Sequence, residues 1–201
     1  MSTPPFAVTY EYRCPFARNV HEHLVAALKG GAGWDVEFLP FSLSQAHVEE
    51  GGTTVWDEPE KAPELLAMES GLVVRDRDPD RFLDVHLALF SARHDEGRDL
   101  RDRQVVAGAL AAAGADPAAV FAEVDEGWPR ELFKKAHEHA VAEHKVFGVP
   151  TFVLGDQAVF VRIMTRPAGD AELARATIEH VVGLVGAHLE LNEFKHTTVA
   201  R

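Results

Sequence analysis

The chain has 201 residues, with 20 Lys plus Arg against 32 Asp plus Glu, and therefore a formal net charge of −12. At 46% hydrophobic and 26% charged residues, the composition is that of a globular protein and excludes a disordered chain. The acidic balance argues against nucleic acid and against an anionic membrane surface as partners. With one cysteine and no secretory signal in its N-terminal residues, the protein is expected to be cytoplasmic, as one large domain or a domain with an insertion.

The first elements in chain order are a strand, a helix and a second strand. Residues 6–12 are rich in aromatic and β-branched residues, which favours a strand. From Phe16 apolar residues recur at helical spacing until Gly30, and Pro15 suits the first turn of that helix. Residues 34–43 are predicted to form the second strand. This order places Cys14 in a strand-to-helix turn, at the N-cap of the helix.

The middle of the chain, residues 48–146, carries helical patterns and no strand pattern. Asp102 and Asp116 are suitable N-cap residues, because their carboxylates can accept the free N–H groups of the first helical turn. The predicted helices of this segment are 81–93, 102–113, one that begins at 116–117, and 129–145.

The end of the chain returns to strands. Residues 149–154 and 158–163 are β-rich, and the short Gly-Asp-Gln connection between them suits a tight hairpin. Asp170 is the predicted N-cap of a last helix that runs to about residue 189. Two further strands and a helix therefore follow the helical segment.

This order predicts an α/β fold that is interrupted by an all-helical insertion. The α/β domain is expected to be discontinuous, formed by residues 1–47 and 147–190. The inserted helical domain is expected over 48–146, and residues 191–201 form a C-terminal tail without a clear pattern.

Cys14 is the first candidate for chemistry. A thiol at a helix N-terminus is close to unpaired backbone N–H groups and to the positive end of the helix dipole, so its pKa is expected to be lowered. Arg13 and Arg18 are close in sequence and would add to this effect. The alternatives are a buried, apolar role for Cys14 and ordinary solvated charge for both arginines.

A second motif is Gly148-Val149-Pro150-Thr151-Phe152. A proline at the start of a strand is compatible with a cis peptide bond, although trans is the common form and stays open at this point.

Together, Cys14-Pro15-Phe16-Ala17 after a strand and the Gly148–Phe152 motif before a hairpin resemble the DsbA family (DsbA/FrnE-like) of thioredoxin-fold oxidoreductases. The resemblance covers roughly residues 6–189. It implies a thioredoxin-like fold with an inserted α-helical domain. It also implies that Cys14 is the nucleophile and that a cis-proline loop faces it and pairs with an extended substrate. The residues implied to bind the substrate or a thiol are Pro15, Phe16, Val149, Pro150 and Thr151.

The sequence departs from the family at Ala17, where the C-x-x-C motif has its second, resolving cysteine. A dithiol enzyme releases its mixed disulfide with that second thiol, so a monothiol protein needs an external one. The resemblance therefore implies thiol–disulfide exchange with a low-molecular-weight thiol as co-substrate, either glutathione or mycothiol, and no tightly bound cofactor. The alternatives are a thiol S-transferase or isomerase similar to the kappa-class glutathione transferases, and a redox-inactive protein that binds a peptide or another partner.

Three further groups of residues are considered as parts of a binding site. Arg162, together with Arg166, follows the hairpin and could hold a carboxylate of the thiol or of the substrate. His137, His139 and His144 share one predicted helix, but there is no H-E-x-x-H motif, so a solvated helix face is expected and no metal site. The aromatic residues Trp56, Phe90, Trp128 and Phe133 either line an apolar pocket over Cys14 or, as their helical spacing favours, belong to the core.

Overall fold

The structure is a computed structural model that describes residues 3–49, 51–193 and 195–196. The elements follow in this order: β1 (Phe6–Tyr10), α1 (Pro15–Lys29), β2 (Val36–Pro40), α2 (Leu43–Ala46), the 3-10 helix η1 (Pro59–Lys61), α3 (Ala62–Arg77), α4 (Pro79–His94), α5 (Arg103–Ala112), α6 (Pro117–Asp125), α7 (Trp128–His144), β3 (Thr151–Leu154), β4 (Gln157–Phe160) and α8 (Ala171–Ala187).

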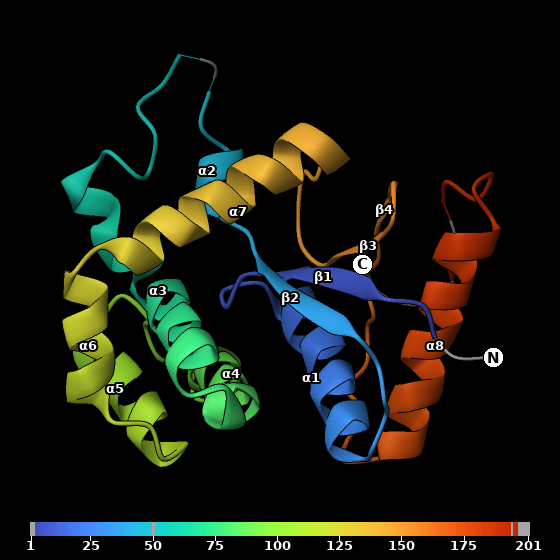
Figure 1. Cartoon of the computed structure of the whole chain (residues 1–201), viewed down its shortest axis with the longest axis horizontal. Helices are drawn as coiled ribbons and strands as arrows, with labels where there is room; N and C mark the ends of the chain where they lie inside the picture. The colour runs from blue at the N-terminus through green and yellow to red at the C-terminus, as the bar shows by residue number, and fades with distance from the viewer. Residues whose placement is uncertain (1–2, 50, 194, 197–201) are drawn as a thin grey trace.

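The four described strands form one mixed sheet in the order β2-β1-β3-β4. β1 runs parallel to β2 and antiparallel to β3, and Val8 in its middle is opposite both Phe38 and Phe152. Helices α1 and α8 lie side by side below the sheet, and α7 crosses above it (Figure 1). Because β1 and β3 are neighbours, the start of the chain is joined directly to a segment about 140 residues later.

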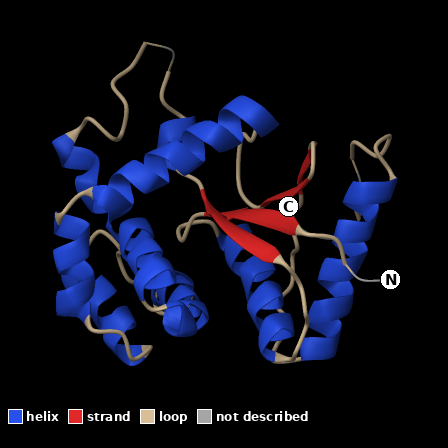
Figure 2. Cartoon of the chain, in the orientation of Figure 1, coloured by secondary structure: helices blue, strands red, loops and turns tan. Residues whose placement is uncertain are grey.

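The helices α3 to α7 are inserted between β2 and β3 and gather at one side of the sheet (Figure 2). α3 is at their centre and contacts α4, α5, α6 and α7. Every residue of α3 from Leu65 to Val74 is buried. A helix that is covered on all sides has no polar face, so the sequence pattern did not reveal it.

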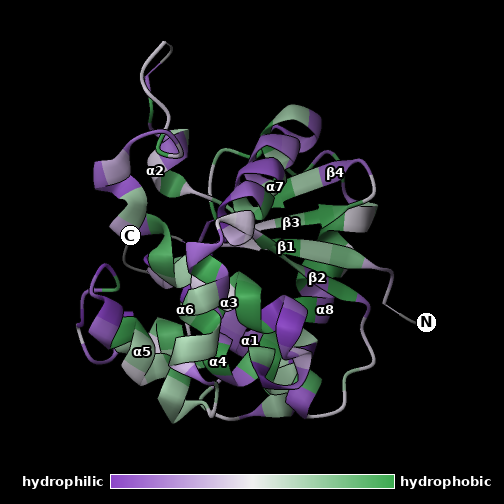
Figure 3. Cartoon of the chain, turned by 60° about the vertical axis from the view of Figure 1, so that its left-hand side comes forward, coloured by the Kyte–Doolittle hydropathy of each residue, from purple (hydrophilic) through white to green (hydrophobic). Residues whose placement is uncertain are grey.

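The buried apolar residues of the sheet and of the helical segment form one continuous cluster. In Figure 3 the strands β1, β2 and β3 are mainly hydrophobic, whereas hydrophilic residues gather on the outer turns of α7. No helix within the described residues is both long enough and apolar enough to cross a membrane.

The predicted starts of three helices are confirmed by their N-cap residues. Asp102 and Asp116 accept hydrogen bonds from backbone N–H groups at 2.8 and 2.9 Å, at the starts of α5 and α6. Asp170 does the same for α8, accepting from the Leu173 N–H at 2.9 Å. These caps satisfy N–H groups that the first helical turn leaves free.

The predicted strand over 34–43 is wrong at its end. β2 stops at Pro40, and Leu43 is the first residue of α2. Ser42 is the cause, because its hydroxyl accepts the Gln45 N–H at 3.1 Å and so caps this short helix. β1 also ends at Tyr10, two residues before the predicted end.

A chain of buried polar groups joins the sheet and α1 to the inserted helices. His21 in α1 donates from Nε2 to the Thr9 carbonyl (3.3 Å) and accepts at Nδ1 from His86 Nε2 in α4 (3.0 Å). His86 Nδ1 accepts from the Tyr12 hydroxyl at 3.0 Å. Burial lowers the pKa of His21 to about 3 and that of His86 well below its usual range, so both rings are neutral at pH 7.

Candidate active site

Cys14 is the N-cap residue of α1, as the sequence predicted. Its Sγ accepts the backbone N–H of Ala17 at 3.4 Å, and Pro15 occupies the first helical position, where no N–H is needed. On the other side of the turn, the Cys14 N–H donates to the Glu11 carbonyl at 3.0 Å. Cys14 is therefore held between β1 and α1 by two hydrogen bonds, one made by its backbone N–H and one by its Sγ.

The second motif lies directly opposite the thiol. The Val149–Pro150 peptide bond is cis, and the thiol of Cys14 donates a hydrogen bond to the Val149 carbonyl, with 3.4 Å between Sγ and the oxygen. The pairing of β1 with β3 makes this contact, because it places the start of β3 beside the loop that follows β1. Cys14 and Val149 are 135 residues apart in the chain.

Thr9 and Thr151 hold the proline loop in place. The Thr151 N–H donates to the Thr9 hydroxyl at 2.8 Å, and the Thr151 hydroxyl donates to the Gly148 carbonyl at 2.8 Å. Both threonines are buried. Sequence reasoning missed Thr9, because a threonine within a strand pattern gives no sign that its hydroxyl pairs with a distant loop.

The expectation of a lowered thiol pKa is wrong. Cys14 is only 7% exposed, and this burial raises the pKa of its thiol above the ordinary value. The N–H groups of Ala17 and Phe16 and the charge of Arg162 act in the opposite direction but do not outweigh burial, to which the Glu11 carboxylate adds. The free protein therefore carries the neutral thiol at pH 7, which agrees with its donation to Val149.

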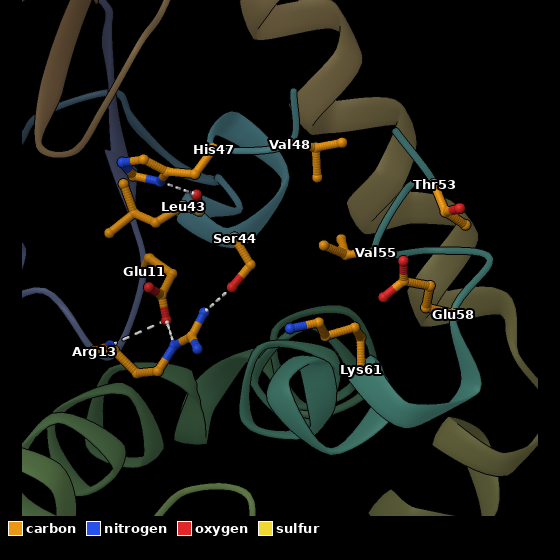
Figure 4. A pocket seen from close by; sticks show the side chains of 10 residues that line it. All are labelled: Glu11, Arg13, Leu43, Ser44, His47, Val48, Thr53, Val55, Glu58 and Lys61. Atoms are coloured by element: carbon orange, nitrogen blue, oxygen red, sulfur yellow. Dashed lines mark hydrogen bonds and ion pairs between the residues drawn. The ribbon is translucent and has the colours of Figure 1, made fainter. Parts of the chain in front are cut away.

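Arg13 does not support the thiolate as expected. Its guanidinium donates to Glu11 at 2.9 Å, to Glu64 at 3.2 Å and to the Ser44 hydroxyl at 2.8 Å. Figure 4 shows Arg13, Glu11 and Ser44 in the wall of a pocket of about 570 Å³, together with Lys61 from η1. All three nitrogens of the guanidinium are engaged by these groups, and Arg13 is not among the charges that act on the pKa of Cys14.

Arg18 and Arg162, the other two candidate arginines, differ in their partners. Arg18 pairs with Asp95 at 3.0 Å, and Glu22 is 3.9 Å from it, so its charge is compensated at the surface. The guanidinium of Arg162 lies over the ring of Phe16, 5.1 Å from its centre, and 6.0 Å from the Phe160 ring. Arg162 thus remains beside the Cys14 turn, where it lowers the pKa of the thiol.

The profile of the DSBA-like thioredoxin domain matches residues 7–165. The chain belongs to this family. No curated protein matches the sequence closely.

Solved structures support the same fold for this DSBA-like chain. The 2-hydroxychromene-2-carboxylate isomerase structure has a TM-score of 0.63 at 16% identity and covers 92% of this chain and 98% of its own. The cytosolic disulfide reductase DsbM from Pseudomonas aeruginosa, solved with GSH, gives 0.59 at 18%, covering 90% and 100%. The thiol-disulfide oxidoreductase MdbA from Actinomyces oris gives 0.59 at 18%, covering 87% and 81%. At these identities the likeness concerns the fold, which is thioredoxin-like.

The aromatic residues that the sequence left between a pocket over Cys14 and the core pack away from the thiol. Trp56 and Phe133 pack against each other with ring centres 5.1 Å apart, and Phe90 packs on Tyr12 at 4.9 Å, all three in the core. Trp128 donates to a carboxylate within the helical segment, Glu123, at 2.7 Å. The core alternative for these aromatic residues is therefore the correct one.

Contrary to the prediction from the sequence, the histidines of α7 do not all lie on one solvent-exposed face of the helix. His137 is 4% exposed and accepts the Ser42 N–H at 3.3 Å, whereas His139 and His144 contact each other with ring centres 5.9 Å apart. Among the residues that the structure describes, no three His, Cys, Asp or Glu side chains are grouped as metal ligands.

Proposed function

We propose that this DSBA-like protein is a monothiol thiol–disulfide oxidoreductase in which Cys14 is the only reacting cysteine. The observation that carries the proposal is the position of Sγ, between the N-terminus of α1 and the carbonyl of Val149 in the cis-proline loop. Cys14 is the only cysteine in the chain, and Ala17 is three residues after it. A second thiol must then come from a low-molecular-weight molecule such as glutathione or mycothiol.

The proposed reaction has two exchange steps. Cys14 loses its proton, and the thiolate attacks one sulfur of a disulfide substrate, which breaks the S–S bond and releases the other half as a thiolate. The new disulfide joins Cys14 to the substrate. The thiolate of the low-molecular-weight thiol then attacks the substrate sulfur, forms a free disulfide and restores Cys14. Electrons balance, because the substrate disulfide is the oxidant and the small thiol is the reductant.

The residues around the sulfur suit an extended or flat substrate. Pro15 is exposed at the start of α1, and Phe16 presents its ring beside the exposed Arg162. Val149 and Pro150 form the opposite side, and Thr151 fixes their loop. We propose that these groups contact the substrate and that Arg162 binds its carboxylate, because no carboxylate within the described residues pairs with this guanidinium.

The test is the reaction of the purified protein with glutathione disulfide at several pH values, followed by intact mass. A single adduct at Cys14 that glutathione removes is expected, and its rate of formation should rise with pH well above 7, because burial raises the pKa of the thiol. Cys14→Ser should form no adduct and lose all exchange activity. The absence of any adduct at every pH would reject the proposal.

One observation favours a second candidate, thiol transfer or isomerisation. A neutral Cys14 that donates a hydrogen bond can donate it equally to the sulfur of a bound thiol, whose own thiolate then attacks an electrophile. A serine hydroxyl can donate in the same way. Cys14→Ser therefore separates the candidates, because it should abolish exchange and retain a substantial part of a transfer activity. A Cys14→Ser variant that keeps full activity in a thiol assay would be inconsistent with both candidates. A wild-type protein that forms no adduct and has no activity with thiols would be a binding protein.

We also propose a cytoplasmic location, since the exchange cycle needs a reduced thiol pool. The similar structure of DsbM is that of a cytosolic protein. Fractionation of the native host with an antibody to the chain tests this location.

A further inference from the structure

The buried carboxylate of Glu11 is close to the reacting thiol and has no place in the function proposed above. Glu11 lies in the loop between β1 and α1 and is 3% exposed. Its carbonyl accepts the Cys14 N–H at 3.0 Å, which closes a tight turn that contains both side chains. The turn thus joins the backbones of Glu11 and Cys14, and the Glu11 carboxylate is one of the charges that raise the pKa of the thiol.

The carboxylate is paired on one side only. Its Oε1 accepts two hydrogen bonds from Arg13, from the backbone N–H at 3.1 Å and from Nε at 2.9 Å. Its Oε2 is buried and has no hydrogen-bond partner within the described residues. The negative charge near the thiol is thus only partly compensated.

The same hydrogen bonds control where the Arg13 charge lies. Nε is bound to Glu11, and the two terminal nitrogens are bound to Glu64 and to Ser44, which lines the pocket of Figure 4. A guanidinium with all three nitrogens engaged is fixed in orientation. Arg13 cannot turn to the sulfur of Cys14 without breaking these contacts.

Charged and titratable groups reach the thiol turn from several elements. Glu11 and Arg13 are on its own segment, and Arg162 comes from the chain after β4. From α4, His94 donates to the Tyr12 carbonyl at 2.9 Å, and burial lowers the pKa of its ring, so it is uncharged at pH 7. From α3, Glu64 lies beyond Arg13. Of the negative groups in this set, Glu11 is the one that lies in the same turn as Cys14.

We propose that Glu11 is a positioning residue that keeps Cys14 in its protonated, hydrogen-bond-donating form and holds the Arg13 guanidinium away from the sulfur. Burial is the largest cause of the raised pKa of the thiol, and Glu11 adds to it in two ways. Its carboxylate disfavours a second negative charge in a poorly solvated turn, and it holds the Arg13 cation that could offset this charge. The proposal deepens the function proposed above and rests on Cys14 being its reacting group. It makes Cys14 slow as a nucleophile at neutral pH and suitable as a donor to a bound thiol.

The test is the pH profile of Cys14 alkylation by iodoacetamide, followed by intact mass and by thiolate absorbance. Glu11→Gln should move the midpoint to lower pH by about half a unit to one unit, which is about three- to tenfold faster alkylation at pH 7. Glu64→Gln is the matched control, because it removes another carboxylate bound to Arg13 without placing a change in the thiol turn. Its midpoint should stay close to that of the wild type. Arg162→Gln should shift the midpoint in the opposite direction to Glu11→Gln.

An unchanged or higher midpoint in Glu11→Gln would overturn the proposal. So would an equal shift in Glu64→Gln, since freeing Arg13 alone would then explain it. If Glu11→Gln does not fold, the double variant Glu11→Gln/Arg13→Gln removes both charges together and should still show the lower midpoint. Alkylation needs no enzymatic turnover, so a shifted midpoint in a protein that forms no mixed disulfide would uphold this inference and reject the proposed function.

Discussion

Acidification from pH 7 to pH 5 should destabilise the protein through its buried histidines, above all through His21, His86 and His137. His21 and His86 are fully buried and His137 is 4% exposed. Burial lowers the pKa of His21 to about 3 and of His137 to about 4, and lowers that of His86 well below its usual range. In the unfolded chain each ring returns to a pKa near 6.5.

The sign and size of the effect follow from proton linkage. Below pH 6.5 the unfolded chain binds protons that the folded protein does not, so the free energy of unfolding decreases as pH falls. The loss per histidine is about 1.4 kcal/mol per pH unit, or about 2 kcal/mol at pH 5. Three such groups give up to about 6 kcal/mol, a large part of the roughly 5–15 kcal/mol that stabilises a typical domain.

Equilibrium unfolding in urea, followed by tryptophan fluorescence at half-unit steps between pH 7.5 and 5, measures this dependence. His137→Leu should reduce the slope by about 1.4 kcal/mol per pH unit, whereas His47→Gln, which changes an exposed histidine, should leave it unchanged. Carboxylates with lowered pKa values, such as Asp99 at about 2, act below this pH window. A free energy of unfolding that is flat between pH 7 and 5 would refute the reasoning.

Two substitutions test packing and charge in the inserted helices. Gly71→Ala should destabilise the protein by about 1–3 kcal/mol, because its Cβ would be 2.5 Å from the Tyr12 hydroxyl. As the control, Gly183→Ala in α8 meets no atom within 4 Å and should raise the melting temperature. Arg130→Gln leaves Glu69, 2% exposed, without the cation 2.7 Å from it, and should cost about 2–3 kcal/mol at pH 7 in urea unfolding. Burial already raises the pKa of Glu69, so this loss should be smaller at pH 5, where the carboxyl can protonate, and an equal loss at both pH values would contradict the assignment.

Local sequence signals predicted the elements that begin with a recognisable cap or that have one apolar face. α1 and α8 have both, and the aspartates before α5 and α6 marked their starts correctly. α4 shows its apolar face, since Phe82, Val85, Leu89 and Phe90 are all buried. Where burial surrounds a helix, as in α3, the periodic contrast disappears and the helix cannot be recognised from its pattern.

The candidate site was predictable in its position and not in its electrostatics. Cys14 at a helix N-cap follows from the order of strand, proline and helix, which are neighbours in the chain. Its raised pKa depends on the burial of the sulfur, which outweighs the N–H groups of α1 and the charge of Arg162 from the chain after β4. Arg13 shows the same limit, because Glu64 and Ser44, which hold its guanidinium, are 51 and 31 residues away.

Sequence patterns alone were enough to predict an acidic α/β protein with one thiol at the start of a helix, a proline motif before a hairpin and a helical insertion. These features depend on residues within one or two helical turns of each other, where propensity and capping act. The assembled fold was needed to show that Thr9 hydrogen-bonds to the proline loop, that His21 and His86 join the sheet to the insertion, and that burial raises the pKa of Cys14. Each of these depends on strands and helices far apart in the chain coming together and excluding water, because desolvation and charge act through space and not along the sequence.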